Sequence, residues 1–174
     1  DTEAGEYFYA NQMVASGEDE IIVLVNNNFW IFNEKGLKTK LTDLAGENYF
    51  SDMYHLDDGR ILVGSYMEKG YQLFELDVKA GKLSSEPISL PGGRYQYNVL
   101  CAGEGSQLYL NDENGLSVFD LESGDVSELI NWINSDIDTS SVYNFVPLKD
   151  GRIFGTGYDP DTSKEMFVLL TKKP

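Results

Sequence analysis

One stretch decides the fold: Asp57-Asp58-Gly59-Arg60-Ile61-Leu62-Val63-Gly64. An apolar segment runs into its Asp-Gly turn, and an alternating apolar segment runs out of it. Asp-Gly suits a tight hairpin, because glycine takes positive φ at no steric cost and aspartate tolerates it. Nearly the same sequence returns near the C-terminus as Lys149-Asp150-Gly151-Arg152-Ile153-Phe154-Gly155. Two copies in one chain indicate a repeated structural unit rather than a functional site.

The repeat has a regular period. Gly59, Gly105 and Gly151 lie 46 residues apart at each step, and each sits in a polar turn between two apolar runs. A weaker first copy is the polar turn at residues 16–20, which precedes the apolar run at residues 21–25. A fixed period of this length is the signature of a repeat architecture. The chain therefore contains four copies of one unit.

A second turn follows the first at a similar distance in the first three copies. Residues 77–81 and 120–124 both read Asp-x-x-x-Gly between alternating segments, and residues 33–36 form the same device one residue shorter. The Asp or Asn side chain can bond its own downstream amides, while Gly supplies the left-handed residue. The fourth copy stops before this turn would come, so we expect it to lack an outermost strand.

These patterns predict an all-β domain. Alternating segments with turns about every 8–12 residues are typical of β-proteins, and about four strands in about 40–45 residues are the signature of a β-propeller blade. We predict one β-propeller-like domain over residues 1–174, with four blades of about four antiparallel strands at roughly 6–44, 45–90, 91–134 and 135–174. A closed four-bladed propeller and part of a larger propeller both remain open. Residues 127–133 fit either a short helix or the outer strand of the third blade.

Charge limits the partners. The formal net charge is −16, with 29 acidic against 13 basic residues. Nucleic acid and anionic membrane would both be repelled by such a surface, so we expect neither as a partner of this domain. No segment is long and apolar enough to span a bilayer, and Asp1 does not begin a signal peptide. We therefore expect either a cytosolic protein or one whose leader is left out of this sequence.

Catalytic residue sets are scarce. His55 and Cys101 are the single histidine and the single cysteine. A hydrolytic triad would need His55, and the sequence contains no Gly-x-Ser-x-Gly nucleophile elbow. One histidine and one cysteine cannot build the usual transition-metal site. Cys101 lies in an apolar run and is predicted to be buried. Calcium-like oxygen patterns occur at residues 134–140 and 159–161, but both lack the Gly and Glu that complete an EF-hand loop. We predict no catalytic residue, metal or cofactor.

The remaining candidate is a surface. In a propeller, the turns described above share one face, and the more varied loops lie on the other. Tyr66 and Tyr158 occupy equivalent places in copies two and four. Aromatic and polar groups on one rim suit recognition of sugar or peptide. The bland interpretation is that these tyrosines pack between blades. The predicted ligand-binding residues are Tyr66, Tyr95, Tyr97, Tyr158 and Asp159.

The C-terminal third carries a family resemblance. It rests on Leu129-Ile130-Asn131-Trp132-Ile133-Asn134-Ser135-Asp136-Ile137-Asp138, on the segment 147–154, and on the ending 167–174. These resemble propeller-like regions found upstream of solute-binding domains in bacterial surface lipoproteins related to ABC transporters. The resemblance implies an exported module at the cell surface, with a downstream solute-binding domain as partner. It supplies no functional residues.

The resulting prediction is a non-catalytic extracellular binding or interaction module that recognises a glycan or a peptide. Two alternatives stay open. One is a carbohydrate-active enzyme using paired carboxylates on the loop face, because 29 acids are available and their separation in space decides such chemistry. The other is a purely structural spacer.

Overall fold

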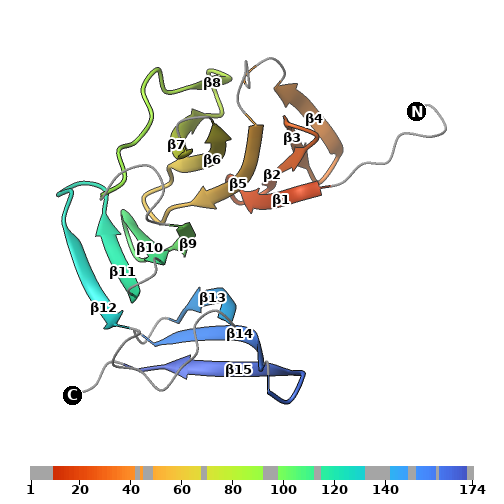
Figure 1. The fold of residues 1–174 in the computed structure, drawn as a ribbon. Coiled ribbons are helices and arrows are strands. Elements are labelled where there is room, and N and C mark those ends of the chain that lie inside the picture. The colour runs from red at the N-terminus through yellow and green to blue at the C-terminus, as the bar shows by residue number, and fades with distance from the viewer. Residues whose placement is uncertain are drawn as a thin grey trace. The chain divides into compact units, whose positions relative to one another are not determined.

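The computed structural model describes residues 10–41, 44, 49–67, 70–91, 98–111, 115–131, 142–148, 152–159 and 161–171. Over these ranges the chain forms fifteen strands and no helix (Figure 1). The strands make four antiparallel sheets, and the order of the strands in each sheet follows their order in the chain. The predicted all-β class and the four blade-like repeats are confirmed. Consequently, the described residues contain no helix that could cross a membrane.

The sheets are as follows. The first contains β1 (Ala10–Ala15), β2 (Glu20–Val25), β3 (Asn28–Asn33) and β4 (Gly36–Leu41). The second contains β5 (Tyr49–His55), β6 (Ile61–Met67), β7 (Gly70–Asp77) and β8 (Lys82–Leu83). The third contains β9 (Asn98–Ala102), β10 (Gln107–Asn111), β11 (Gly115–Asp120) and β12 (Val126–Asn131). The fourth contains β13 (Val142–Pro147), β14 (Ile153–Asp159) and β15 (Lys164–Leu170), so it has three strands, as expected.

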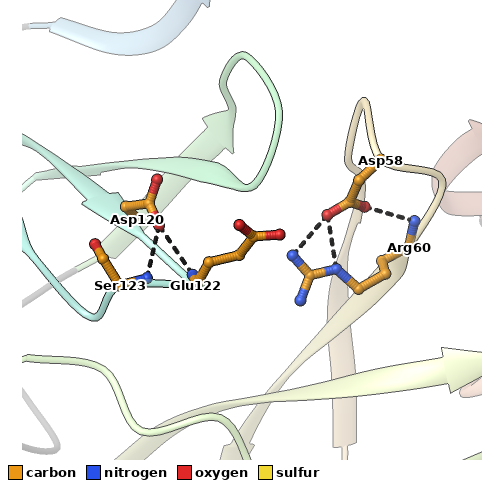
Figure 2. A network of polar contacts seen from close by, with 5 residues as sticks. All are labelled: Asp58, Arg60, Asp120, Glu122 and Ser123. Carbon is orange, nitrogen blue, oxygen red and sulfur yellow. Dashed lines mark hydrogen bonds and ion pairs between the residues drawn. The ribbon is translucent and has the colours of Figure 1, made fainter.

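The turns form as their sequences predict. In the β5–β6 hairpin, Gly59 has φ +89° and its N–H donates to the Leu56 carbonyl at 3.0 Å. Asp58 accepts from the Arg60 backbone N–H at 2.9 Å and also pairs with the Arg60 guanidinium (Figure 2). In the β11–β12 turn, Asp120 accepts from the backbone N–H groups of Glu122 and Ser123, both at 2.9 Å (Figure 2). Short-range side-chain bonds therefore specify these hairpins.

The structure decides the conformation of two segments for which the sequence pattern was ambiguous or misleading. Residues 127–133 fit a helix or a strand, and residues 126–131 are the strand β12. The alternating pattern predicts that the outer strand of the second blade runs over residues 82–90, and this extent is wrong. The strand β8 covers only Lys82–Leu83 and is followed by an isolated bridge between Leu73 and Ile88. The reason lies in Ser84, whose hydroxyl accepts from the Glu75 N–H and donates to the Glu86 carbonyl. This side chain thus takes over bonds that a longer ladder would make.

The chain divides into two compact units, residues 1–95 and 96–174. In the first unit, alternating residues of the first and second sheets meet in one core, which includes Ile22, Leu24, Phe29, Phe50 and Val63. In the second unit, the third and fourth sheets share a smaller core of Leu116, Phe145, Ile153 and Leu170. Period-two alternation places every second side chain in these cores. Each unit therefore buries the facing sides of two neighbouring sheets.

Cys101 lies on β9 in the second unit. It was predicted to be buried, and it is partly buried. Loss of solvation still raises the pKa of its thiol to about 12. A thiol with such a pKa is protonated at neutral pH, and a protonated thiol is a weak nucleophile. The structure therefore agrees in part with the predicted burial of Cys101.

Candidate ligand-binding surface

Three tyrosines stand in one row at an end of the second sheet. Tyr49 on β5 lies opposite Tyr66 on β6, which in turn lies opposite Tyr71 on β7. Residues opposite each other in register point to the same face of a sheet. Tyr49 is 60% exposed and Tyr66 is 55% exposed, whereas Tyr71 is buried. The Tyr66 and Tyr71 rings meet edge to face, with centroids 4.8 Å apart. The exposed Tyr66 ring therefore rests against the buried Tyr71 ring, and Tyr49 lies opposite Tyr66 in the strand pairing.

A carboxylate lies one row below the tyrosines, on the same face. Asp52 is the residue that follows a β-bulge at Ser51, and Gly64 lies opposite it on β6. Its Oδ2 accepts from the Ser51 hydroxyl at 2.6 Å and from the Tyr71 hydroxyl at 3.2 Å. The hydroxyls of Tyr71 and Tyr54 are 2.9 Å apart. We call Tyr49, Tyr66, Tyr71 and Asp52 the tyrosine surface.

Gly64 makes this arrangement possible. The Tyr71 side chain starts on β7 and reaches Asp52 on β5, so it must cross the strand β6 that lies between them. It crosses at Gly64, where an added Cβ would stand 2.0 Å from the Tyr71 hydroxyl oxygen. Any side chain at position 64 would therefore displace the Tyr71 ring.

The first sheet contributes two polar side chains to the neighbouring edge of β5. Gln12 on β1 donates through Nε2 to Asp52 Oδ1 at 3.4 Å and accepts through Oε1 from the Met53 N–H at 2.6 Å. Asn27, in the β2–β3 turn, accepts through Oδ1 from the Phe50 N–H at 2.8 Å. Two backbone donors on the edge of β5 are thus capped by side chains rather than left free for another strand.

A β-bulge recurs at the same position of the inner strand in three repeats. The pairing register shifts between Ala10 and Gln12 on β1, and in the same way before Asp52 on β5 and before Asn144 on β13. Each of these three residues stands four positions before the residue that opens the first turn of its repeat. In the third repeat that position is Val99, and the bulge on β9 falls at residue 100. Bulges re-aim side chains and are common beside binding sites.

Sequence reasoning missed this column of residues. The signal was present, because aligning the copies on their first turns places Gln12, Asp52 and Asn144 at one position of an otherwise apolar inner strand. Tyr49 was missed as well, since its pairing with Tyr66 depends on the register that the bulge creates.

The predicted site residues fall in three places. Tyr66 belongs to the tyrosine surface. Tyr158 lies in the second unit, is 44% exposed and stands opposite Glu165 in the β14–β15 hairpin. Asp159 is next to it, and Tyr95 and Tyr97 lie outside the described residues.

Asp159 has a local structural role. Its carboxylate accepts from the Thr162 hydroxyl at 2.6 Å and from the Asp161 N–H at 2.9 Å. The bond from the Thr162 hydroxyl, followed by the bond from the Asp161 N–H, lowers the pKa of Asp159. The carboxylate is therefore engaged in shaping the β14–β15 turn.

The tyrosine surface is electrostatically simple. Burial, followed by the Asp52 charge, raises the pKa of Tyr66. Burial is also the largest cause that raises the pKa of Tyr71, where the neighbouring Tyr54 and Asp52 add to it. Both phenols thus keep their protons at neutral pH and can donate hydrogen bonds.

Metal binding and triad chemistry find little support elsewhere. Among the described residues, no group of three His, Cys, Asp or Glu side chains could hold a metal ion. His55 is exposed and lies at the other end of β5, beside the β5–β6 turn. The tyrosine surface is therefore the candidate that the described residues support best.

No protein-family model and no curated protein matches the sequence. Solved structures match the fold. The extracellular domain of a protein described as a one-component system of B. thetaiotaomicron aligns over 93% of this chain and 22% of its own length, with a TM-score of 0.58 and 15% identity. Regucalcin, a calcium-binding protein of Agrobacterium tumefaciens, aligns over 94% of this chain and 60% of its own, with a TM-score of 0.58 and 14% identity.

A third similar structure is an enzyme. Virginiamycin B lyase of Staphylococcus aureus aligns over 93% of this chain and 55% of its own length, with a TM-score of 0.51 and 13% identity. The chain thus spans between about a fifth and three fifths of the proteins to which it is similar. At these identities the likeness concerns the β-propeller fold, which enzymes and binding proteins share.

Proposed function

We propose that the chain is an extracellular, non-catalytic recognition module that holds its ligand on the tyrosine surface. One observation carries the proposal: Tyr49 and Tyr66, side by side and more than half exposed, stand directly above a hydrogen-bonded carboxylate. Tyrosines are enriched at binding interfaces because they offer a large apolar face and a polar tip at low entropic cost. Tyr71 braces the Tyr66 ring, so the surface is largely organised before a ligand arrives.

Recognition fits the tyrosine surface better than glycoside chemistry. A glycosidase needs two carboxyl groups about 5–10 Å apart on either side of the bond that is cleaved. The hydrogen-bonded network described at this surface contains one carboxylate, Asp52, and that group already accepts from Ser51 and Tyr71. An acid for the leaving group and a base for water would both have to come from elsewhere.

The setting of the module is part of the proposal. Similarity in fold to an extracellular domain supports an extracellular location. The resemblance of residues 129–138 and 147–154 to regions of surface lipoproteins supports a role beside a solute-binding domain. We also keep Tyr95, Tyr97, Tyr158 and Asp159 as proposed ligand-binding residues, each to be tested by itself.

The experiment is a binding screen with a chemical readout. The protein is titrated with neutral oligosaccharides, uronic-acid oligosaccharides and a peptide library, and binding is followed by tyrosine fluorescence and calorimetry. We expect one ligand class to bind, and we expect Tyr66→Ala to weaken its binding about tenfold, because a stacked aromatic contributes up to about 1.5 kcal/mol. Mass spectrometry should recover the ligand unchanged.

The matched control is His55→Ala, which truncates an exposed side chain at the opposite end of β5. Its affinity should equal that of the wild type. Cleavage of the ligand would contradict the proposed function. So would a ligand that binds Tyr66→Ala and Tyr49→Ala as tightly as it binds the wild type. Tyr158→Ala tests separately whether the second unit contributes to binding.

A further inference from the structure

The chemical class of the ligand follows from which groups at the tyrosine surface are already occupied; this step rests on the proposed function. The first class to consider is an extended peptide. Such peptides bind sheets by adding a strand to a free edge, where backbone N–H and C=O groups are open. On β5 the Phe50 and Met53 N–H groups already donate to Asn27 and Gln12. Strand addition at this edge would have to break both bonds.

The second class is an anionic ligand. Such ligands are held by Arg or Lys side chains or by clustered N–H donors. The residues joined at this surface, Gln12, Ser51, Asp52, Tyr54 and Tyr71, include no cation. Among the described residues that form the tyrosine surface, the charged group is the Asp52 carboxylate, and the whole chain has a net charge of −16. A negatively charged ligand would therefore be repelled both at the site and at long range.

The groups that remain open match hydroxyls. A carboxylate accepts about four hydrogen bonds, and three contacts engage Asp52, of which the bond from Gln12 Nε2 is long at 3.4 Å. The Gln12 amide carries a second N–H beside this acceptor. Both side chains are partly exposed. An acceptor and a donor side by side suit two neighbouring hydroxyl groups, one of which donates while the other accepts.

The tyrosine rings supply the second half of the match. Tyr49 and Tyr66 are opposite residues on adjacent strands, and Cβ atoms in such pairs are about 5 Å apart. Their faces are apolar, and the edge contact from Tyr71 helps to hold the Tyr66 ring. A sugar ring presents C–H groups on its faces and hydroxyls around its rim, so it can stack on a phenol while its rim reaches polar groups below.

We propose that the tyrosine surface binds a neutral carbohydrate. One sugar ring stacks on Tyr66 while neighbouring hydroxyls of that ring bond Asp52 and Gln12, and Tyr49 continues the platform for the next sugar. The surface selects an uncharged, hydroxyl-rich ligand for two reasons. The Asp52 carboxylate repels an acidic sugar, and the side-chain bonds on the edge of β5 hinder the addition of a peptide strand.

The test uses matched ligands and matched variants in calorimetric titrations of the full chain. The probes are neutral gluco-, xylo-, galacto- and arabino-oligosaccharides, the corresponding oligosaccharides that contain uronic acids, and extended peptides of similar length. We expect a neutral oligosaccharide to bind, with its acidic counterpart at least about tenfold weaker. Tyr66→Ala should lower affinity about tenfold or more, and Tyr66→Phe should retain most of it, because the ring does the stacking.

The polar half is tested by Asp52→Asn. This change keeps the shape and one acceptor oxygen, and removing the charged acceptor should cost about tenfold or more in affinity, because hydrogen bonds to charged groups are stronger than bonds between neutral groups. His55→Ala should bind like the wild type, and circular dichroism melts identify any variant that fails to fold. If a variant fails to fold, the wild-type protein is used instead. A spin-labelled oligosaccharide should then broaden the NMR signals of Tyr49 and Tyr66.

Each other outcome is decisive. Two outcomes would overturn the carbohydrate inference and leave the proposed function standing. In one, the acidic oligosaccharide binds better than the neutral one. In the other, a peptide binds best and Tyr66→Ala abolishes its binding. A neutral oligosaccharide that binds without sensitivity to Tyr66 or Asp52 overturns both. If no probe class binds a folded protein, both fail as well.

Discussion

Gly64 shows how one absent side chain can organise a surface. It lies at the crossing point of the Tyr71 side chain over β6, and its position opposite Asp52 brings the Tyr71 hydroxyl within 3.2 Å of that carboxylate. Nothing about its backbone requires glycine, because Gly64 is not among the residues with positive φ. The requirement is one of space, and it arises from a residue on the neighbouring strand.

The first prediction concerns Gly64→Ala. The new Cβ would stand 2.0 Å from the Tyr71 hydroxyl oxygen, so a buried ring must move and its bonds to Asp52 and Tyr54 must change. Forcing atoms into a packed site costs about 1–3 kcal/mol. We expect the free energy of unfolding in urea to fall by about this amount. Ligand affinity should fall too, because Tyr66 loses its brace.

The matched control is Gly17→Ala. A Cβ at Gly17 meets nothing within 4 Å, and this glycine does not have positive φ. Exposed substitutions of this kind change stability by about 0.5 kcal/mol or less. Equal effects of the two substitutions would show that Tyr71 does not lie over Gly64.

At the residue scale, local chemistry was predictable and distant contact was not. The Asp58-Gly59 pair predicts a turn from its residue types alone. The prediction succeeds because the hydrogen bonds of this turn join residues within four positions of each other. The role of Gly64 depends on Tyr71, and that of Asp52 depends on Gln12, forty residues away. Tyr66 was selected by its place in the repeat, while its partner Tyr49 required the register of β5 and β6.

At the scale of elements, the capped edge of β5 links the first two sheets. Gln12 reaches from β1 to the Met53 N–H, and Asn27 reaches from the β2–β3 turn to the Phe50 N–H. An uncapped edge strand exposes donors that invite pairing with other chains. The polar residue after the bulge on β1 therefore both protects an edge and supports the carboxylate of the tyrosine surface.

The second prediction concerns this cap. Gln12→Ala removes the acceptor for the Met53 N–H and one donor to Asp52, and a lost hydrogen bond in a partly buried site costs about 1–2 kcal/mol. We expect lower stability and faster hydrogen exchange at the Met53 amide, measured by NMR. Gln12→Glu separates the two roles, because a carboxylate still accepts from Met53 but repels Asp52. Unchanged exchange at Met53 in Gln12→Ala would contradict the cap.

The third prediction concerns the aspartates of the second turns. The bond from the Ser123 N–H is the largest cause that lowers the pKa of Asp120, and the Glu122 N–H adds to it. A carboxyl group with a lowered pKa in the folded state stabilises the fold above its unfolded pKa, near 4. That contribution is lost as pH falls through the folded pKa. Asp120→Ala should therefore melt below the wild type at pH 7.

The difference in melting temperature should shrink below about pH 4, where the wild-type carboxylate takes up a proton. Asp120→Asn provides the control, because its amide oxygen can still accept from the Ser123 and Glu122 N–H groups. It should lose less stability at pH 7 than the alanine variant. A difference that stays constant from pH 7 to pH 3 would show that the charge of Asp120 plays no part.

The length of an element proved harder to predict than its existence. Alternation and turn residues located the strands, because both signals are local. They overestimated the outer strand of the second sheet, where the Ser84 hydroxyl takes the ladder bonds. The bulges on β1, β5 and β13 were also invisible to a count of alternating residues, since a bulge adds one residue without changing its chemistry.

At the scale of the whole molecule, the repeat made the fold predictable. Four copies of the first turn indicated four sheets, and the structure contains four sheets. The packing of neighbouring sheets determines which side chains meet in each core. The alternation of the sequence predicts only which face of a strand is apolar. The ligand remains a proposal, because exposed tyrosines pack or bind according to what stands beside them.

The last prediction concerns charge. With 29 acidic and 13 basic residues, the folded chain repels itself, and a net charge far from zero destabilises the compact state. Raising NaCl from 0.01 M to 1 M shortens the screening length from about 30 Å to about 3 Å. We expect the melting temperature to rise by about 3 °C, which corresponds to about 1 kcal/mol for a chain of this size.

Divalent cations separate screening from specific binding. An ion bound by the folded state raises stability according to its own affinity, beyond its effect on ionic strength. The oxygen-rich stretches at residues 134–140 and 159–161 lack the Gly and the Glu that complete an EF-hand loop, so we expect CaCl2 and MgCl2 at equal ionic strength to give equal melting temperatures. A larger rise with calcium alone would place a site in residues such as 134–140, which lie outside the described ranges. A melting temperature that falls with NaCl would mean that attractive ion pairs outweigh the repulsion of the net charge.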